Sequence, residues 1–207
     1  AATKANDDAK KADANKTASA YYSPIMFLFI GGAFLALSIE RTGLHRRLAL
    51  FVLNRAGNTP WRLLLAVMTA TALLSTINSN TSTALIMMPI ALAVLAAGGI
   101  GEEEHDGMAG ALVLGVAFAA SLGGLGTLVG SPTNPIAAGL IEKQLGLEIG
   151  FLDWMGFGLP ILLVAVPLTA WILARVQRID SHSFDTAAAR KAIGESVVWS
   201  ITEKRQL

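Results

Sequence analysis

Hydrophobic positions along the chain gather into four long stretches that contain no Asp, Glu, Lys or Arg. These stretches cover residues 17–39, 63–101, 107–141 and 154–174, with lengths of 23, 39, 35 and 21 residues. A helix needs about 20 residues to cross the hydrocarbon core of a bilayer, which is roughly 30 Å thick. The first and last stretches therefore each predict one transmembrane helix, at 21–39 and 152–175. Each of the two middle stretches is too long for one simple transmembrane helix and does not divide into two regular ones.

A polar cluster divides the second stretch. Eight of the nine residues from Ser75 to Thr83 are polar. The apolar arms on either side, 63–74 and 84–97, are each only about 20 Å long as helices. We therefore expect a re-entrant helical hairpin over 58–98, with the polar cluster at its tip. Non-helical backbone at membrane depth is tolerated only where it is buried in protein or lines a cavity.

Helix-breaking residues divide the third stretch. Residues 123–135 hold four glycines and two prolines, a composition that does not sustain a regular helix. The segment 107–142 is therefore expected to be one transmembrane helix that is broken in its middle. Paired interrupted segments of this kind are the best sequence indication of the binding site of a secondary transporter.

The remaining segments are more polar. Residues 1–20 are expected to be a polar loop or tail, 40–57 an interfacial amphipathic helix, and 176–207 a linker. The basic residues of 41–62 and of the linker place both segments in the cytoplasm. Because the chain does not begin with Met, we expect it to be an excerpt of something longer.

Composition supports an integral, multi-pass membrane protein and gives no sign of an enzyme. The chain is 53% hydrophobic and only 15% charged, whereas soluble domains average about 25% charged residues. The net charge of +1 gives no general attraction to nucleic acid, and there is no cysteine. No nucleophile with a base, paired carboxylates or metal-ligand spacing stands out. Gly124-x-Gly126-x-x-x-Gly130 resembles a dinucleotide fingerprint, but no βαβ pattern surrounds it.

The two interruptions together suggest a site for an anion and a cation. Helix N-termini carry partial positive charge and unpaired N–H groups, which suit an anion. Unwound carbonyls and hydroxyl oxygens suit a hard cation such as Na⁺. For any single residue, an ordinary packing role remains open, because Ser, Thr and Asn also hydrogen-bond between membrane helices.

The order and spacing of four motifs resemble the divalent anion/sodium symporter family, the dicarboxylate transporters. The motifs are Ser75-x-x-x-Ser79-Asn80-Thr81, the broken-helix segment 120–134, the helix and interfacial segments 29–36 and 43–47, and the linker 199–205. The resemblance covers roughly residues 21–207. It implies an all-α membrane protein, half of an inverted-repeat, elevator-type transporter that is usually a homodimer in the plasma or inner membrane. The second repeat, which holds half of the substrate site, is missing from this chain.

The resemblance also assigns roles to residues. It implies a Na⁺ site formed by Ser75, Ser79, Asn80, Gly123, Gly124, Gly126 and Thr127. It implies substrate contacts from Ser79, Asn80, Thr81, Thr133 and Asn134. The expected substrates are succinate, malate, fumarate, citrate or sulfate, with Na⁺ as the expected coupling ion and no organic cofactor.

Three alternatives remain open at this point. The first is a dicarboxylate exchanger that does not use Na⁺. The second is a Na⁺/H⁺ antiporter or arsenite permease of a related fold, although a proton carrier needs a titratable group and the four charge-free stretches contain no Asp or Glu. The third is a membrane scaffold that does not transport, for which replacement of Asn80 or Thr81 would have no effect.

Overall fold

The computed structural model describes residues 59–100 and 107–179, together with isolated positions 10, 11, 27, 30, 31, 34, 38, 185 and 188. Within 59–100 and 107–179 every long element is a helix, in the order α4 (Pro60–Ser75), α5 (Asn80–Ala97), α6 (Met108–Gly123), α7 (Thr133–Leu145) and α8 (Phe151–Val176). This confirms the all-helical fold class for that part of the chain. The segments expected at 1–20, 21–39, 40–57 and 176–207 lie wholly or mostly outside the described residues.

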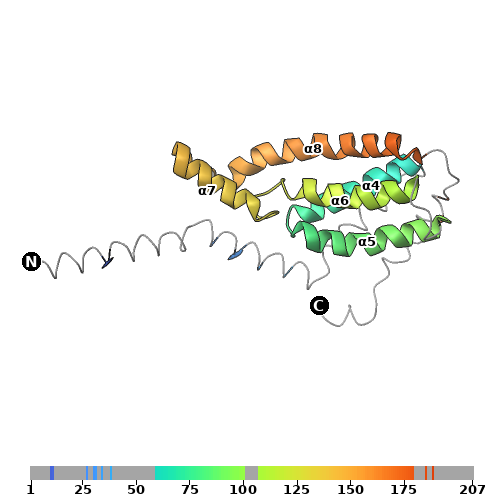
Figure 1. The fold of residues 1–207 in the computed structure, drawn as a ribbon, viewed down its shortest axis with the longest axis horizontal. Helices are drawn as coiled ribbons and strands as arrows, with labels where there is room; N and C mark the ends of the chain where they lie inside the picture. The colour runs from blue at the N-terminus through green and yellow to red at the C-terminus, as the bar shows by residue number, and fades with distance from the viewer. Residues whose placement is uncertain are drawn as a thin grey trace, which may run out of the picture.

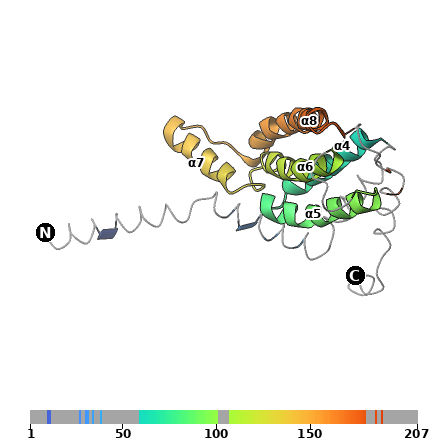
Figure 2. The same cartoon turned by 45° about the vertical axis from the view of Figure 1, so that its right-hand side comes forward.

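The helices form a bundle with α4 and α6 in the middle. Figures 1 and 2 both show α8 on one side of this central pair and α5 on the other, while α7 extends beyond one end. Helices α4 and α6 run parallel, because Gly115 lies against Leu64 and Met68 while Gly123 lies against Ala72 and Ser75. Two consecutive helix breaks are thereby brought to the same end of the bundle.

Small residues let α6 approach α4 closely. Every fourth residue of one face of α6 is Ala or Gly, and all of them are buried, namely Ala111, Gly115, Ala119 and Gly123. A Cβ placed on Gly115 would lie 3.1 Å from the side chains of Leu64 and Met68, and one on Gly123 would overlap with the backbone of Ala72. Stripes of small residues at this spacing allow close contact between helices in membranes, where apolar surface alone gives no preference for protein over lipid.

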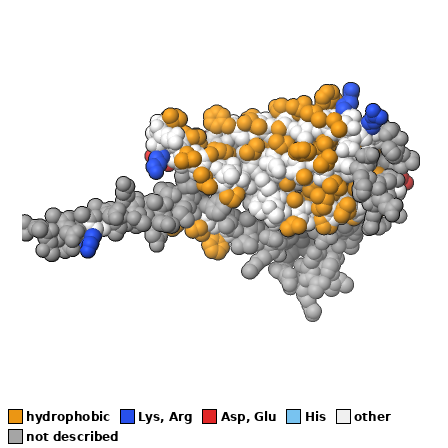
Figure 3. Space-filling view, in the orientation of Figure 1, with side chains coloured by type: hydrophobic (Ala, Val, Ile, Leu, Met, Phe, Trp, Pro, Cys, Tyr) orange, Lys and Arg blue, Asp and Glu red, His pale blue; other side chains and the backbone are white. Residues whose placement is uncertain are grey.

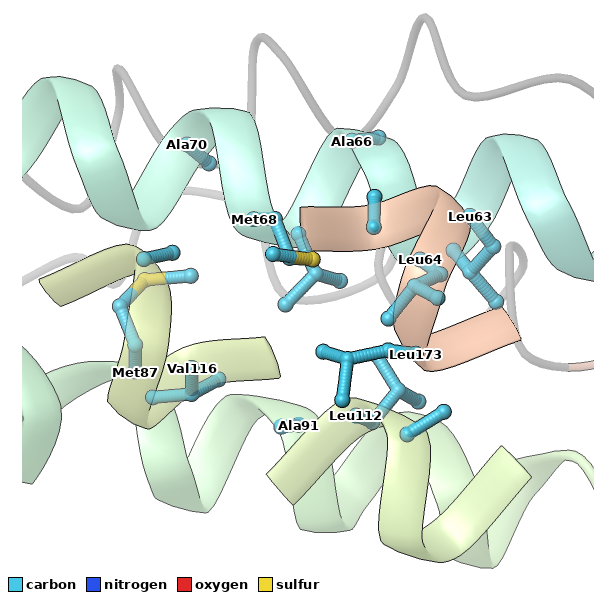
Figure 4. Packing of buried hydrophobic residues seen from close by; sticks show 14 of the residues in the cluster. Leu63, Leu64, Ala66, Met68, Ala70, Met87, Ala91, Leu112, Val116 and Leu173 are labelled. Carbon is cyan, nitrogen blue, oxygen red and sulfur yellow. The ribbon is translucent and has the colours of Figure 1, made fainter. Parts of the chain in front are cut away.

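Larger side chains fill the space that the small stripe leaves. Figure 4 shows Met68 of α4, Met87 of α5, Val116 of α6 and Leu173 of α8 pointing into one shared core. Each of these four side chains is 5% exposed or less. The core thus ties α5 and α8 to the central pair over most of the bundle's length.

The outer surface of the bundle is apolar. Along α8, buried residues recur at Gly158, Leu162, Val166 and Ala170, while many large apolar side chains between them are exposed. Figure 3 shows hydrophobic side chains over this outer face, with the Lys and Arg side chains of the bundle toward its ends. Two helices, Asn80–Ala97 and Phe151–Val176, are long and apolar enough to be candidate membrane spans.

The polar cluster at 75–83 is only partly non-helical. Helix α4 ends at Ser75 and α5 already begins at Asn80, so residues 76–79 alone form the turn. The Oγ of Ser79 accepts a hydrogen bond from the N–H of Ser82 at 3.2 Å and caps α5, a role for which Ser is well suited. Helix α5 has 18 residues and qualifies as a candidate span. Of the two helices beside the turn, only α4, about 24 Å long, is too short to cross the hydrocarbon core of a bilayer.

We predict that Gly123→Ala destabilises the protein. The new methyl group would overlap with the backbone of Ala72, and overpacking of this kind costs about 1–3 kcal/mol. Thermal unfolding of the full-length protein in detergent checks this prediction. Gly156→Ala on α8 is the matched control, since a Cβ there meets nothing within 4 Å, and it should leave stability unchanged or raise it by up to about 1 kcal/mol. Equal midpoints for the two variants would contradict the close approach of α4 and α6.

Candidate cation and anion site

Four helix ends meet at one end of the bundle. Helices α4 and α6 end at Ser75 and Gly123, and the hydroxyl of Ser75 donates a hydrogen bond to the backbone O of Ala120 in the last turn of α6. Helices α5 and α7 begin beside the same point, since the side chains of Asn80 and Asn134 both contact Gly124. Partial negative charge from two C-termini and partial positive charge from two N-termini are therefore placed together.

Ser75 and Asn80 present an oxygen pair with one proton between them. The Oγ of Ser75 lies 2.9 Å from the Oδ1 of Asn80, and the same hydroxyl also contacts the backbone O of Ala120. A hydroxyl has one proton, whereas an amide oxygen and a carbonyl oxygen can only accept. When the proton is given to Ala120, two oxygen atoms face each other with lone pairs, an arrangement that a bound cation stabilises.

The loop between α6 and α7, residues 124–132, is held against the 76–79 turn by Thr127. Its hydroxyl donates to the backbone O of Thr76 and accepts from the N–H of Gly130 at 3.1 Å. Both hydrogen bonds are buried. Thr127 thus joins two segments that are 51 residues apart in the sequence.

Asn134 closes the same loop from its other end. The side chain is 3% exposed, and its amide Nδ2 donates to the backbone O of Gly124 and of Thr127, at 2.7 Å in each case. Both amide hydrogens are therefore used inside the loop. Asn134 thus holds the backbone of the loop in place. Its side chain has no N–H left for a ligand from outside the described part of the chain.

The predicted glycines lie where backbone and side chains come too close for a Cβ. A Cβ on Gly124 would overlap with the amide of Asn80, and one on Gly126 would lie 2.9 Å from the Cγ2 of Thr76. Gly130, which was not among the predicted site residues, is equally restricted, since a Cβ there would lie 2.9 Å from the backbone O of Ser75. The sequence indicated Gly130 only by its position in the glycine-rich segment.

The other predicted polar residues line the exposed side of the site. Ser79, Thr81 and Thr133 are exposed. Ser79 caps α5, and the Oγ1 of Thr133 lies 2.9 Å from the Oγ of Ser131. As the first residues of α5, Asn80 and Thr81 carry backbone N–H groups that have no partner within the helix.

Two residues of α8 support the loop from outside, and no pattern in the sequence indicated either of them. The indole Nε1–H of Trp154 donates to the backbone O of Leu125 at 3.0 Å. A Cβ on Gly158 would lie 2.6 Å from that same oxygen. The loop thereby lies between the 76–79 turn and α8.

Neutral oxygen atoms provide all the candidate cation ligands. Helices α4, α5 and α6 and the 124–132 loop contain no Asp or Glu. Across the described part of the chain, no group of three or more His, Cys, Asp or Glu residues is placed to hold a metal ion. Hydroxyl, amide and carbonyl oxygens suit a hard, weakly charged cation, and they are poor ligands for soft transition metals.

The chain matches a known protein family over most of its length. The family model described as "Citrate transporter" matches residues 9–203. The chain belongs to the citrate transporter family. The resemblance to dicarboxylate transporters inferred from the motifs is thereby confirmed, and the family is one of integral membrane transporters and not of enzymes.

Relatives of this chain are named as sodium-dependent dicarboxylate transporters. The SdcS protein of Staphylococcus saprophyticus is 41% identical over 161 residues, which are 75% of this chain and 31% of that protein. The SdcS protein of Staphylococcus aureus strain USA300 is 37% identical over 172 residues, 77% of this chain and 32% of that protein. The chain thus spans about a third of the length of these relatives.

We predict that Thr127→Val destabilises this family member and Thr127→Ser does not. Valine keeps the shape of threonine but leaves the buried O of Thr76 without its donor, a loss that costs about 1–3 kcal/mol, and it leaves the N–H of Gly130 only the backbone O of Thr127 at 3.4 Å. Serine retains the hydroxyl and serves as the control. The measurement is thermal unfolding of the full-length protein in detergent. Identical midpoints for the two variants would show that the hydroxyl of Thr127 does not hold the loop.

Proposed function

We propose that this chain forms the first-repeat core of a transporter that carries dicarboxylates or other divalent anions and is driven by Na⁺. The expected substrates are succinate, malate, fumarate, citrate or sulfate. The proposal rests on the site geometry, on the family, and on the names of relatives of which the chain spans only about a third.

One observation supports the cation site most strongly. Ser75 offers one proton to two acceptors, Ala120 O and Asn80 Oδ1. A Na⁺ ion beside the oxygen atoms of Ser75 and Asn80 would satisfy the lone pairs that the single proton leaves unpaired. The hydroxyl of Ser79 and the backbone of Gly123, Gly124, Gly126 and Thr127 would complete the coordination.

The anion site is proposed on the exposed side of the same helix ends. Thr81, Asn80 and Ser79 at the start of α5 and Thr133 at the start of α7 can donate hydrogen bonds to a carboxylate, supported by the partial positive charge of two helix N-termini. For Asn134 we propose a different role from the direct contact that the resemblance suggested, because its amide hydrogens are donated to the loop.

Coupling between the ions would follow from the absence of acidic residues. The helices α4, α5 and α6 and the 124–132 loop offer no carboxylate to neutralise a bound Na⁺. In a partly dehydrated site, electrostatic attraction is much stronger than in water. Bound Na⁺ would therefore raise the affinity for a divalent anion, and by reciprocity the anion would raise the affinity for Na⁺.

The larger assembly is proposed from the family resemblance. We propose that the 58–98 segment enters and leaves the membrane on the same side. A second, inverted repeat would supply the other half of the substrate site, and the complete transporter would work as a homodimer by an elevator mechanism in the plasma or inner membrane.

Uptake of labelled succinate by the full-length protein in proteoliposomes tests this proposal. Uptake should require an inward Na⁺ gradient and should fall more than about tenfold in Asn80→Ala, because an interaction with a charged ligand contributes about 1.5–3 kcal/mol. Thr81→Val should also impair uptake. Thr69→Val is the control, since its hydroxyl bonds only to Leu65 of its own helix.

Three results would change the proposal in different ways. Uptake that requires internal dicarboxylate but not Na⁺ would indicate an exchanger and remove the cation site. No uptake of succinate, citrate or sulfate would contradict the substrate class. Normal uptake by both Asn80→Ala and Thr81→Val would contradict the site itself.

A further inference from the structure

Helix α8 contacts the 124–132 loop, which also contacts the 76–79 turn. Trp154 donates its indole N–H to the backbone O of Leu125 at 3.0 Å. One helical turn further on, a Cβ on Gly158 would lie 2.6 Å from that oxygen and 2.9 Å from the backbone O of Gly126. The backbone O of Leu125 is thus directed at α8.

The neighbours of Leu125 give its peptide groups unusual freedom. Gly124 and Gly126 flank it, and glycine restricts backbone rotation less than any other residue. Both glycines are required here, because a Cβ on either would collide with Asn80 or Thr76. The orientation of the peptide group between Leu125 and Gly126 is therefore set by its hydrogen bonds, since its N–H donates to the backbone O of Gly123 at 2.9 Å and its carbonyl accepts from Trp154.

Other carbonyls of the loop are already fixed by other donors. Those of Gly124 and Thr127 accept from Asn134, and that of Gly123 accepts from the N–H of Gly126 at 2.9 Å. For Leu125 the indole of Trp154 is the donor. If this peptide group rotated, the neighbouring backbone of the proposed cation site would rotate with it.

We propose that Trp154 is a positioning residue that sets the affinity for Na⁺ by holding the Leu125 peptide group in one orientation. This inference rests on the proposed function, because it acts on the proposed cation site. Trp154 does not touch the ion. It raises affinity because a loop that is already ordered loses less conformational freedom when the ion binds.

A second tryptophan of α8 gives a matched comparison. Trp171, near the other end of the helix, is 51% exposed and lies under the guanidinium of Arg175, at 5.3 Å from its ring centroid. Tryptophans often serve as anchors at the membrane surface. A pure anchor role for Trp154 would predict that its replacement resembles the replacement of Trp171.

The test compares Trp154→Phe with Trp171→Phe in the full-length protein in proteoliposomes. Phenylalanine keeps an aromatic ring but removes the N–H donor and one of the two fused rings, and Trp171→Phe loses the same ring. For Trp154→Phe, the Na⁺ concentration that gives half-maximal succinate uptake should rise about two- to tenfold, the range that one neutral hydrogen bond supports. The maximal rate at saturating Na⁺ should stay close to that of the parent. Trp171→Phe should leave both quantities unchanged.

A fluorescence titration gives a measurement that does not depend on transport. In a variant that keeps Trp154 as its single tryptophan, added Na⁺ should change the indole emission, and Asn80→Ala should abolish this change. Choline is the control for ionic strength. Because this titration keeps Trp154 in place, it can still be made if the Trp154→Phe variant does not fold.

The outcomes separate this inference from the function on which it rests. An unchanged Na⁺ midpoint in Trp154→Phe, combined with lost uptake in Asn80→Ala, would overturn the role of Trp154 and leave the proposed function standing. A lower maximal rate with an unchanged midpoint would also overturn it. Succinate uptake by the parent protein that does not depend on Na⁺ would overturn both the role of Trp154 and the proposed function.

Discussion

The parallel packing of α4 on α6 is the contact on which the site depends. It is possible because Gly115 and Gly123 bring the two backbones close together, and Gly123 tolerates no side chain. Parallel packing places the ends of the two helices at the same level, so that the 76–79 turn and the 124–132 loop meet. Thr127 then connects these segments across 51 residues of sequence. A looser contact would leave both breaks with unpaired backbone groups, which is unfavourable at membrane depth.

The converging helix ends provide charge without ionised side chains. In the proposed site, two C-termini would offer carbonyl and hydroxyl oxygens to a cation, and two N-termini would offer N–H groups to an anion. Because α4, α5, α6 and the loop contain no Asp or Glu, each of the two proposed ligands would be the counter-charge of the other. This dependence gives a physical reason for the two to bind together. It also explains why Ser75 and Asn80, both uncharged, are central to the proposed mechanism.

The sequence predicted much of this arrangement because its signals are local. Long apolar stretches predicted helices, and the glycines and prolines of 123–135 predicted the loss of helix between Gly123 and Thr133. The start of α5 was placed too late, because a capped first turn rich in Ser, Thr and Asn has the same composition as a loop. The loop-closing role of Asn134 and the contact from Trp154 to Leu125 depend on how distant segments pack, and no local pattern encodes them.

The most direct measurement is a density map of the full-length protein in Na⁺, compared with one in choline. We expect a density peak beside the oxygen atoms of Ser75 and Asn80 in Na⁺, in contact with the 124–127 backbone and absent in choline. A map that shows these oxygen atoms without an ion in Na⁺, while the bound cation lies elsewhere in the protein, would contradict the cation site that joins the two helix breaks.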